Sequence, residues 1–422
     1  MKKSLLTSIG LTALATILVA CASAATDDVI DLTEETVEED AAMEGDSESD
    51  EAAGNDDEIM TSEEVPPHLR TVTRGWETDF TRHTVDYDEI LSGGPPRDGI
   101  PSIDEPQFET IAESEAWLAG TEPVIVVEVE DDARAYPLSI LTRHEIVNEE
   151  FNGVPLAVTF CPLCNSALVF DRRVNGEVYE FGVSGLLRGS DLIMYDRTTE
   201  SLWQQFTGEG IVGFHAGDQL DFVASSLVSF DSFREAHPEG EVLSRETGIY
   251  PAGTYGVNPY VGYDDLSNNQ PFLFRNMGEI DTRLPAMLRV AGVNVDGASI
   301  AYPYDLLAEE LVIQDTFNGQ NVVLFFAFGT NSALGAQRIA NAEDVGAATV
   351  FDPNLNGQTL TFSPGDEDGR FVDAETGTTW NLLGQAIEGE LEGEQLERLL
   401  STDHFWFSWA AFFPETDIYS AN

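Results

Sequence analysis

The sequence predicts a β-rich α+β protein in which two homologous β-rich repeats pack as a pseudo-two-fold pair, with short helices. Its apolar residues fall into short runs such as 124–129, which are separated by turn formers and are typical of strands. A unit of this kind recurs with an offset of 166 residues, as from Tyr136 to Tyr302. Self-similarity at a fixed offset indicates a duplicated structural unit. The 42% hydrophobic content and 24 phenylalanines are those of a globular protein.

The first 20 residues have the layout of a bacterial lipoprotein signal peptide. Lys2 and Lys3 precede an apolar run that ends at Ala20, directly before Cys21. We expect Cys21 to become lipidated, so that acyl chains anchor an extracytoplasmic protein to the membrane. An ordinary signal peptide with an incidental cysteine is the alternative. No later run is apolar and long enough to span a bilayer.

Residues 21–65 form a strongly acidic segment without lysine, arginine or aromatic residues. Such a segment cannot bury a core, and we expect a disordered tether that its own charge keeps extended. The acidic excess extends over the whole chain, whose formal net charge is −56. This charge argues against nucleic acid as a partner and fits a saline habitat. It leaves a protein partner open.

Residues 66–122 are expected to be a loop-rich segment packed on the core. The stretch 92–101 has three prolines and three glycines in ten residues, which predicts a loop. A short helix is expected over 108–119, where apolar residues recur on one face.

The first repeat is expected over 123–245, with strands near 124–129, 156–160, 167–171, 178–183 and 192–196. Asn175 and Gly176 form a strong hairpin signal between two of these strands. Residues 184–190 are expected to be a loop, and a helix near 229–233 closes the unit. A loop-like connector, 246–288, leads to the second repeat, 289–422.

The two repeats share a scaffold and differ in their chemistry. Tyr-Pro, Phe-Asn-Gly, Asn-Ser-Ala-Leu, Phe-Asp and Trp recur in register, which suggests turns and core positions. The first copy alone carries Cys161, Cys164, His144 and the stretch 185–194. The frame of the cysteine segment is repeated without its thiols, which favours a chemical role for the two sulfurs.

Pro162 after Cys161 favours a tight turn that brings the two sulfurs together. One interpretation is a metal site, in which two thiolates suit copper(I) or zinc, His144 is the third ligand, and Met194 or Asp191 is the fourth. A second is a redox pair, although the strand-to-helix setting of a thioredoxin is missing. A third is a structural disulfide in an exported protein, although so short a loop gives little stabilisation.

Other residues carry weaker hypotheses. His144 precedes apolar residues, and a histidine at such a position is more often a structural residue with satisfied hydrogen bonds than a metal ligand. The stretch 184–191 could line a pocket, with Arg188 binding an anion, or be a long hairpin loop. The positions considered for ligand binding are Ser184, Arg188, Arg97 and Asp98.

Five motifs together resemble the bacterial and archaeal domain-of-unknown-function family 3179, from about residue 80 to the C-terminus. The resemblance implies no established activity. One departure is Asn165, where the family pattern has Gly after the second cysteine. The motifs are Ser-Gly-Gly-Pro-Pro-Arg-Asp-Gly-Ile-Pro at 92–101, His-Glu-Ile-Val-Asn at 144–148, Thr-Phe-Cys-Pro-Leu-Cys at 159–164, Gly-Val-Ser-Gly-Leu-Leu at 182–187 and Asp-Leu-Ile-Met-Tyr-Asp at 191–196.

Overall fold

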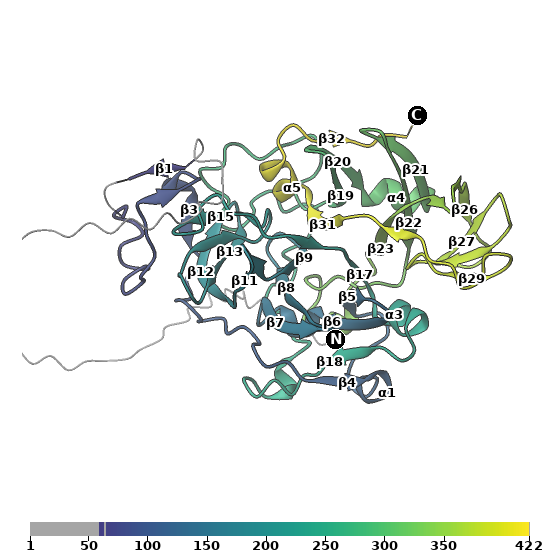
Figure 1. Cartoon of the computed structure of the whole chain (residues 1–422), viewed down its shortest axis with the longest axis horizontal. Helices are drawn as coiled ribbons and strands as arrows, with labels where there is room; N and C mark the ends of the chain where they lie inside the picture. The colour runs from purple at the N-terminus through teal and green to yellow at the C-terminus, as the bar shows by residue number, and fades with distance from the viewer. Residues whose placement is uncertain (1–58, 63–64, 422) are drawn as a thin grey trace, which may run out of the picture. The chain divides into compact units, whose positions relative to one another are not determined.

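The computed structural model describes residues 59–62 and 65–421. The predicted signal peptide, Cys21 and most of the predicted tether therefore lie outside the described residues. The described part is β-rich, with short helices, as the sequence predicts (Figure 1). Its helices are α1 (Ile111–Ser114), α2 (Leu138–Leu141), α3 (Phe230–Ala236), α4 (Tyr304–Glu310) and α5 (Trp406–Phe412), with 3-10 turns η1 (Tyr87–Glu89), η2 (Ala252–Thr254) and η3 (Ile339–Asn341).

The range predicted as the first repeat begins with a five-stranded sheet in the order β17-β5-β6-β18-β4. Its pairs are antiparallel except β6 with β18, which is parallel. Val124 to Val127 in β5 are all fully buried because the strand has an apolar core on each face. The bounds are β17 (Ser225–Ser229), β5 (Pro123–Val129), β6 (Asp132–Pro137), β18 (Glu241–Leu243) and β4 (Phe108–Thr110).

The cysteine segment belongs to a four-stranded sheet in the order β16-β9-β8-β7. β8 and β9 form the hairpin whose turn holds both cysteines, and Cys161 pairs with Ser166 across it. The bounds are β16 (Phe222–Val223), β9 (Ser166–Asp171), β8 (Val154–Cys161) and β7 (Ile146–Phe151), followed by the hairpin of β10 (Arg173–Val174) and β11 (Glu177–Val178). Asn175 and Gly176 both have positive φ, as their predicted turn requires.

A seven-stranded sheet in the order β1-β2-β15-β14-β13-β12-β3 joins the N-terminal segment to the first repeat range. β1 lies inside the range predicted as tether, where Met60 and Thr61 pair with β2. The bounds are β1 (Met60–Thr61), β2 (Arg82–His83), β15 (Gly210–Val212), β14 (Leu202–Gln204), β13 (Asp191–Asp196), β12 (Phe181–Arg188) and β3 (Ile90–Ser92).

The range predicted as the second repeat has sheets of corresponding order, β31-β19-β20-β32 and β21-β22-β23-β30. β20 and β32 are again a parallel pair. The bounds are β31 (Ser401–Phe405), β19 (Arg289–Val295), β20 (Ala298–Pro303), β32 (Asp417–Ile418), β21 (Val312–Phe317), β22 (Gln320–Ala327), β23 (Ala347–Asp352) and β30 (Glu397–Arg398). The chain then adds the hairpin β24 (Asn354–Leu355) and β25 (Gln358–Thr359) and a sheet of β26 (Phe362–Pro364), β27 (Arg370–Asp373), β28 (Thr379–Asn381) and β29 (Ala386–Glu388).

Two local predictions were wrong. The helix expected over 108–119 begins only at Ile111, because Phe108–Thr110 pairs with β18 and Thr110 caps the helix with Glu113. The loop expected over 184–190 is mostly strand. β12 continues to Arg188 through an irregularity between Val183 and Leu186, where Gly185 has a φ of 78°. A bulge of this kind re-aims a strand without ending it.

The largest apolar core surrounds the cysteine hairpin and draws residues from both ranges, including Leu334 and Phe405. The Phe405 amide donates to the Cys164 carbonyl oxygen at 2.9 Å, just before α5 begins. Residues of both ranges thus contact the cysteine turn and hold it in place. No helix in the described part of the chain has the length and apolar character to cross a bilayer.

Candidate metal centre

Both cysteines lie at the end of β8 in a tight turn. The Cys164 amide donates to the Cys161 carbonyl oxygen, and the Asn165 amide donates to that of Pro162, each at 3.3 Å. Asn165 then takes a φ of 53° and returns the chain into β9. This left-handed conformation favours glycine or asparagine, which accounts for asparagine at a position where glycine is expected. Both cysteines are free thiols and are buried.

The β12–β13 hairpin brings a carboxyl group to the thiols. Its two-residue turn, Gly189 and Ser190, has φ of 60° and 70°, and Asp191 follows at the start of β13. The Sγ atoms of Cys161 and Cys164 and a carboxylate oxygen of Asp191 all lie within 4.8 Å of one another. The thiols donate to the carbonyl oxygens of Ser190 and Gly189, at 3.7 Å and 4.0 Å. The geometry therefore unites two sulfurs, a carboxyl group and two carbonyls.

The carboxyl of Asp191 is only half satisfied. Its Oδ2 accepts hydrogen bonds from the Gln204 side chain at 2.6 Å and from the Phe206 amide at 2.9 Å. Its Oδ1 is buried and has no hydrogen-bond partner. Burial raises the pKa of Asp191 to about 7, although the two donors and Cys161 oppose the shift. An orphaned buried oxygen of this kind costs free energy unless another donor or a cation satisfies it.

Burial also raises the pKa of both thiols. The shift is larger for Cys164, whose pKa the neighbouring Cys161 raises further. Within the described residues, neither thiol nor Asp191 hydrogen-bonds or ion-pairs with an arginine or a histidine. Without a bound cation, the thiols are therefore neutral at physiological pH.

The structure places His144 in a different role from the ligand that the sequence suggested. Its Nδ1 lies 2.7 Å from the Pro101 carbonyl oxygen, and its Nε2 lies 2.8 Å from the Tyr255 hydroxyl. A carbonyl can only accept, so Nδ1 carries the proton and Nε2 accepts from Tyr255. Burial lowers the pKa of His144, which favours this neutral form. His144 thus joins the 92–101 loop to the connector, and both ring nitrogens are used.

Met194 and the four positions considered for ligand binding are also engaged inside the protein. Met194 is fully buried in the core that contains both cysteines. Arg188 pairs with Glu89 at 2.7 Å, and Arg97 pairs with Glu200 at 2.6 Å. The Ser184 hydroxyl donates to the Ile193 carbonyl and accepts from the Leu186 amide.

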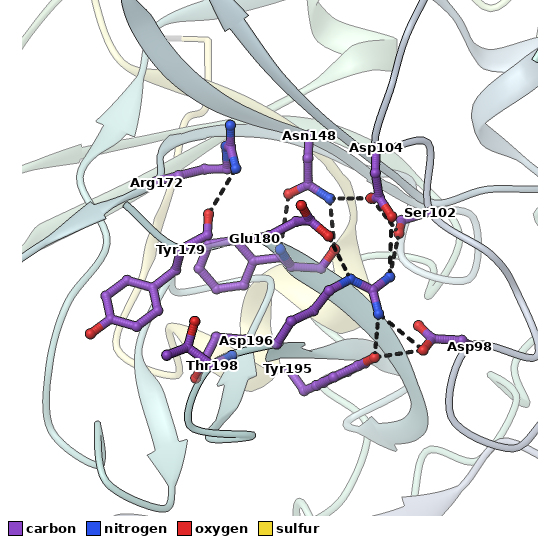
Figure 2. Close-up of polar contacts among 12 residues, drawn as sticks. Asp98, Ser102, Asp104, Asn148, Arg172, Tyr179, Glu180, Tyr195, Asp196 and Thr198 are labelled. Atoms are coloured by element: carbon purple, nitrogen blue, oxygen red, sulfur yellow. Dashed lines mark hydrogen bonds and ion pairs between the residues drawn. The ribbon is translucent and has the colours of Figure 1, made fainter. Parts of the chain in front are cut away.

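Asp98 belongs to a polar network that fixes the N-terminal loop against β7 and the end of β13. Its Oδ2 accepts from the Tyr195 hydroxyl at 2.6 Å and from Arg197 at 3.0 Å. Figure 2 shows this group with Ser102 and Asp104, and Asn148 donates to Asp104 at 2.7 Å. The network joins three chain segments, which are residues 98–104, Asn148 and residues 195–197.

Sequence reasoning missed Glu145, the residue beside His144. It is 7% exposed, and its side chain has no hydrogen-bond or ion-pair partner in the described part of the chain. Burial, followed by the charge of Asp191, raises the pKa of Glu145 to about 8. One signal of its burial was available in the sequence. Glu145 directly precedes the apolar pair Ile146 and Val147, which are expected to begin a buried strand.

These features define a β-rich protein with a buried dithiol–carboxyl group. A family model described as "Protein of unknown function (DUF3179)" matches residues 97–416, and the chain belongs to this family. The predicted family resemblance is thereby confirmed. Neither a curated protein nor a solved structure matches the chain.

Proposed function

We propose that this protein binds one soft metal ion, copper(I) or zinc, through Cys161, Cys164 and Asp191. The observation that carries the proposal is the convergence of three donor atoms within 4.8 Å at a buried site. Thiolates are the protein ligands that copper(I) prefers, and zinc accepts both thiolates and carboxylates. In this proposal Asp191, and not His144, is the third metal ligand, because both ring nitrogens of His144 already have hydrogen-bond partners. Met194 remains a candidate for a further ligand.

The electrostatics of the site support a cation. The ligand atoms and the carbonyls of Gly189 and Ser190 are all electron-rich, and one oxygen of Asp191 has no partner. A divalent ion with two thiolates and one carboxylate leaves a net charge of −1, and copper(I) with two thiolates and a protonated Asp191 leaves the same charge. The positive charge of the metal would thus stabilise the thiolates, whose formation burial otherwise opposes.

A thiol–disulfide enzyme is the second candidate, because the sulfurs are close to each other. Exchange with a protein substrate requires an accessible thiolate. Both thiols are buried and their pKa values are raised, which argues against this role. A structural disulfide remains the third interpretation, and the same experiment distinguishes it.

The test is the metal content of the full chain, purified anaerobically and analysed for copper and zinc. We expect close to one equivalent in the wild type and loss of metal in Cys161→Ser, with Asp191→Asn weakening zinc more than copper(I). Cys21→Ser is the matched control, since it removes the remaining cysteine of the chain and should keep the metal. Equal metal content in wild type and Cys161→Ser would exclude the metal site. A thiol titration would then separate a labile pair from a stable disulfide.

We further propose that the protein is extracytoplasmic and anchored to the membrane through a lipid on Cys21. The charged start, the apolar run and the position of Cys21 support this. Cell fractionation of the same variants tests this proposal. We expect the wild type in the membrane fraction and Cys21→Ser in the soluble fraction.

We also propose that the two β-rich ranges are homologous repeats packed as a pseudo-two-fold pair. Matching hydrogen bonds support the proposal: Phe230 donates to the Glu122 carbonyl, and Trp406 donates to that of Leu288. Glu122 and Leu288 are separated by the same offset of 166 as Tyr136 and Tyr302. In the second range, Ala327 and Thr330 stand where the first has Cys161 and Cys164, so the proposed metal site belongs to one range only.

A further inference from the structure

A cavity of about 330 Å³ lies beside the cysteine turn. Most of its walls come from three segments: the N-terminal loop with Pro95 and Ile100, the bulged part of β12 with Leu187, and the connector. Leu163, from the turn between the two cysteines, contributes to the lining. The Ser190 hydroxyl donates to the Phe272 carbonyl, which ties the connector to the tip of the β12–β13 hairpin.

The lining is apolar and aromatic apart from one carboxyl group. Tyr260, Tyr263 and Phe272 come from the connector, and Phe272 is 48% exposed, so its wall reaches the solvent. Glu145 is the charged residue among the described lining residues, which include no arginine or histidine. An anionic ligand would therefore meet no positive partner here.

The backbone holds Glu145 in place without satisfying its side chain. Its amide donates to the Leu141 carbonyl at 2.7 Å, and its own carbonyl accepts from the Phe160 amide at 2.8 Å. Its φ of 60° is unusual for a residue with a side chain. The carboxyl is buried, contributes to the cavity wall, and makes no hydrogen bond or ion pair in the described part of the chain. A buried carboxyl without a partner in an apolar cavity indicates that the partner is a ligand.

We propose that this cavity binds a small organic cation, an ammonium group on an apolar body, with Glu145 as its counter-ion. Aromatic faces attract cations, and three aromatic side chains line the same cavity as the carboxyl. The apolar walls take up the remainder of the ligand, as in most small-molecule sites. The net charge of −56 on the chain also raises the local concentration of cations. This proposal goes beyond the metal site, since Glu145 is not one of the three metal ligands.

The test compares 2-phenylethylamine with its neutral counterpart 2-phenylethanol by calorimetric titration of the full chain at pH 9, where Glu145, with a pKa of about 8, is ionised and an alkylammonium group is still charged. A charge-assisted hydrogen bond contributes about 1.5–3 kcal/mol, so we expect the amine to bind about 10- to 100-fold more tightly than the alcohol. Glu145→Gln should lose this preference while it still binds the alcohol. Glu149→Gln is the matched control, because Glu149 is also buried but pairs with Arg134 outside the cavity. It should keep the preference.

Two results would overturn the proposal. One is equal affinity of the wild type for amine and alcohol, which would indicate a site for neutral ligands. The other is an amine affinity that Glu145→Gln leaves unchanged. If Glu145→Gln fails to fold, the comparison of the two ligands on the wild type decides alone. Cys161→Ser should bind the amine as the wild type does, so failure of the metal site and failure of this site are distinguishable.

Discussion

Asn165 sets the direction in which the chain leaves the cysteine turn. Its φ of 53° lies in the left-handed region, and its side chain is buried. Most residues with a Cβ lose about 1–2 kcal/mol in this conformation, whereas glycine does not. The departure from the family pattern is therefore a substitution between the two residue types that tolerate this backbone.

We predict that Asn165→Gly changes the free energy of unfolding by less than about 1 kcal/mol, while Asn165→Ala lowers it by about 1–2 kcal/mol. Urea unfolding followed by tryptophan fluorescence measures both. Asn175→Ala is a control for the backbone term alone, because Asn175 has a φ of 52° in an exposed hairpin turn. Equal stability of the alanine and glycine variants at 165 would contradict the argument.

The sequence predicted only part of the candidate site at the residue scale. The two cysteines and their turn could be predicted, because proline in a short segment specifies a bend. Asp191 was one of two residues named as a fourth ligand. The engagement of His144 depends on Pro101 and Tyr255, which lie far from it in the chain, and no local pattern carries that information. Glu145 was missed although its place directly before Ile146 and Val147 was a local signal of burial, because its lack of a partner depends on the surrounding fold.

At the scale of elements, two hairpin corners show the same construction. Asp196 accepts from the Trp203 indole at 3.1 Å and from the amides of Thr198, Thr199 and Ser201. Asp373 accepts from the Trp380 indole at 3.0 Å and from Thr376 and Thr378. These hydrogen bonds lower the pKa of Asp373 against the opposing effect of burial. Each carboxylate thus collects several donors that would otherwise be buried without partners.

We predict that Asp196→Asn and Asp373→Asn each lower the free energy of unfolding by about 1–3 kcal/mol, since an amide turns one acceptor into a donor facing other donors. The corners share no partner, so the double variant should lose the sum of the two within about 0.5 kcal/mol. Urea midpoints measure all three variants. Thr198→Ala, which keeps the backbone amide, is a mild control. If Asp196→Asn lowers the free energy of unfolding and Asp373→Asn leaves it unchanged, the proposed equivalence of the two ranges is weakened.

Elements differed in how well local sequence specified them. The hairpin at Asn175 and Gly176 and helix α3 were predicted because turn chemistry and capping are local. The segment 108–119 was not, because β4 forms only by pairing with β18, more than a hundred residues away. The extension of β12 to Arg188 likewise depends on pairing with β3 and β13. Long-range pairing overrode local propensity in both cases.

At the scale of the whole molecule, the four buried carboxyl groups with the largest upward pKa shifts in the described part of the chain dominate how stability depends on pH. Burial is the main cause in each case, and it raises the pKa of Glu145 to about 8 and those of Glu149, Asp191 and Asp403 to about 7. In the unfolded chain these groups titrate near 4.5 for glutamate and 3.8 for aspartate. The folded state therefore holds four protons more tightly than the unfolded state does.

The sign of the effect follows from this difference. A group with a raised folded pKa contributes stability that is fully present below its unfolded pKa and is lost as pH rises through its folded pKa. Groups with lowered folded pKa values act in the opposite direction. Burial lowers the pKa of His404 from 6.5 to about 3, so this histidine removes stability as pH falls below about 6.5, and hydrogen-bonded carboxylates such as Asp171 and Asp373 do so below about pH 4. Stability should therefore be greatest near pH 5.

We predict that the urea midpoint of the metal-free protein falls from pH 5 to about pH 8, the highest of these folded pKa values. Each buried carboxyl contributes a slope of up to about 1.4 kcal/mol per pH unit between its two pKa values. Glu145→Gln should flatten the curve most between pH 7 and pH 8, while Asp403→Asn should flatten it below pH 7. A chelator must be present throughout. Metal binding requires deprotonated ligands, so metal affinity rises with pH and would mask the fall in stability. A midpoint that rises over this range without metal would show that the carboxyls are ionised in the folded protein, and the buried dithiol–carboxyl group would then carry more negative charge than the proposed metal site assumes.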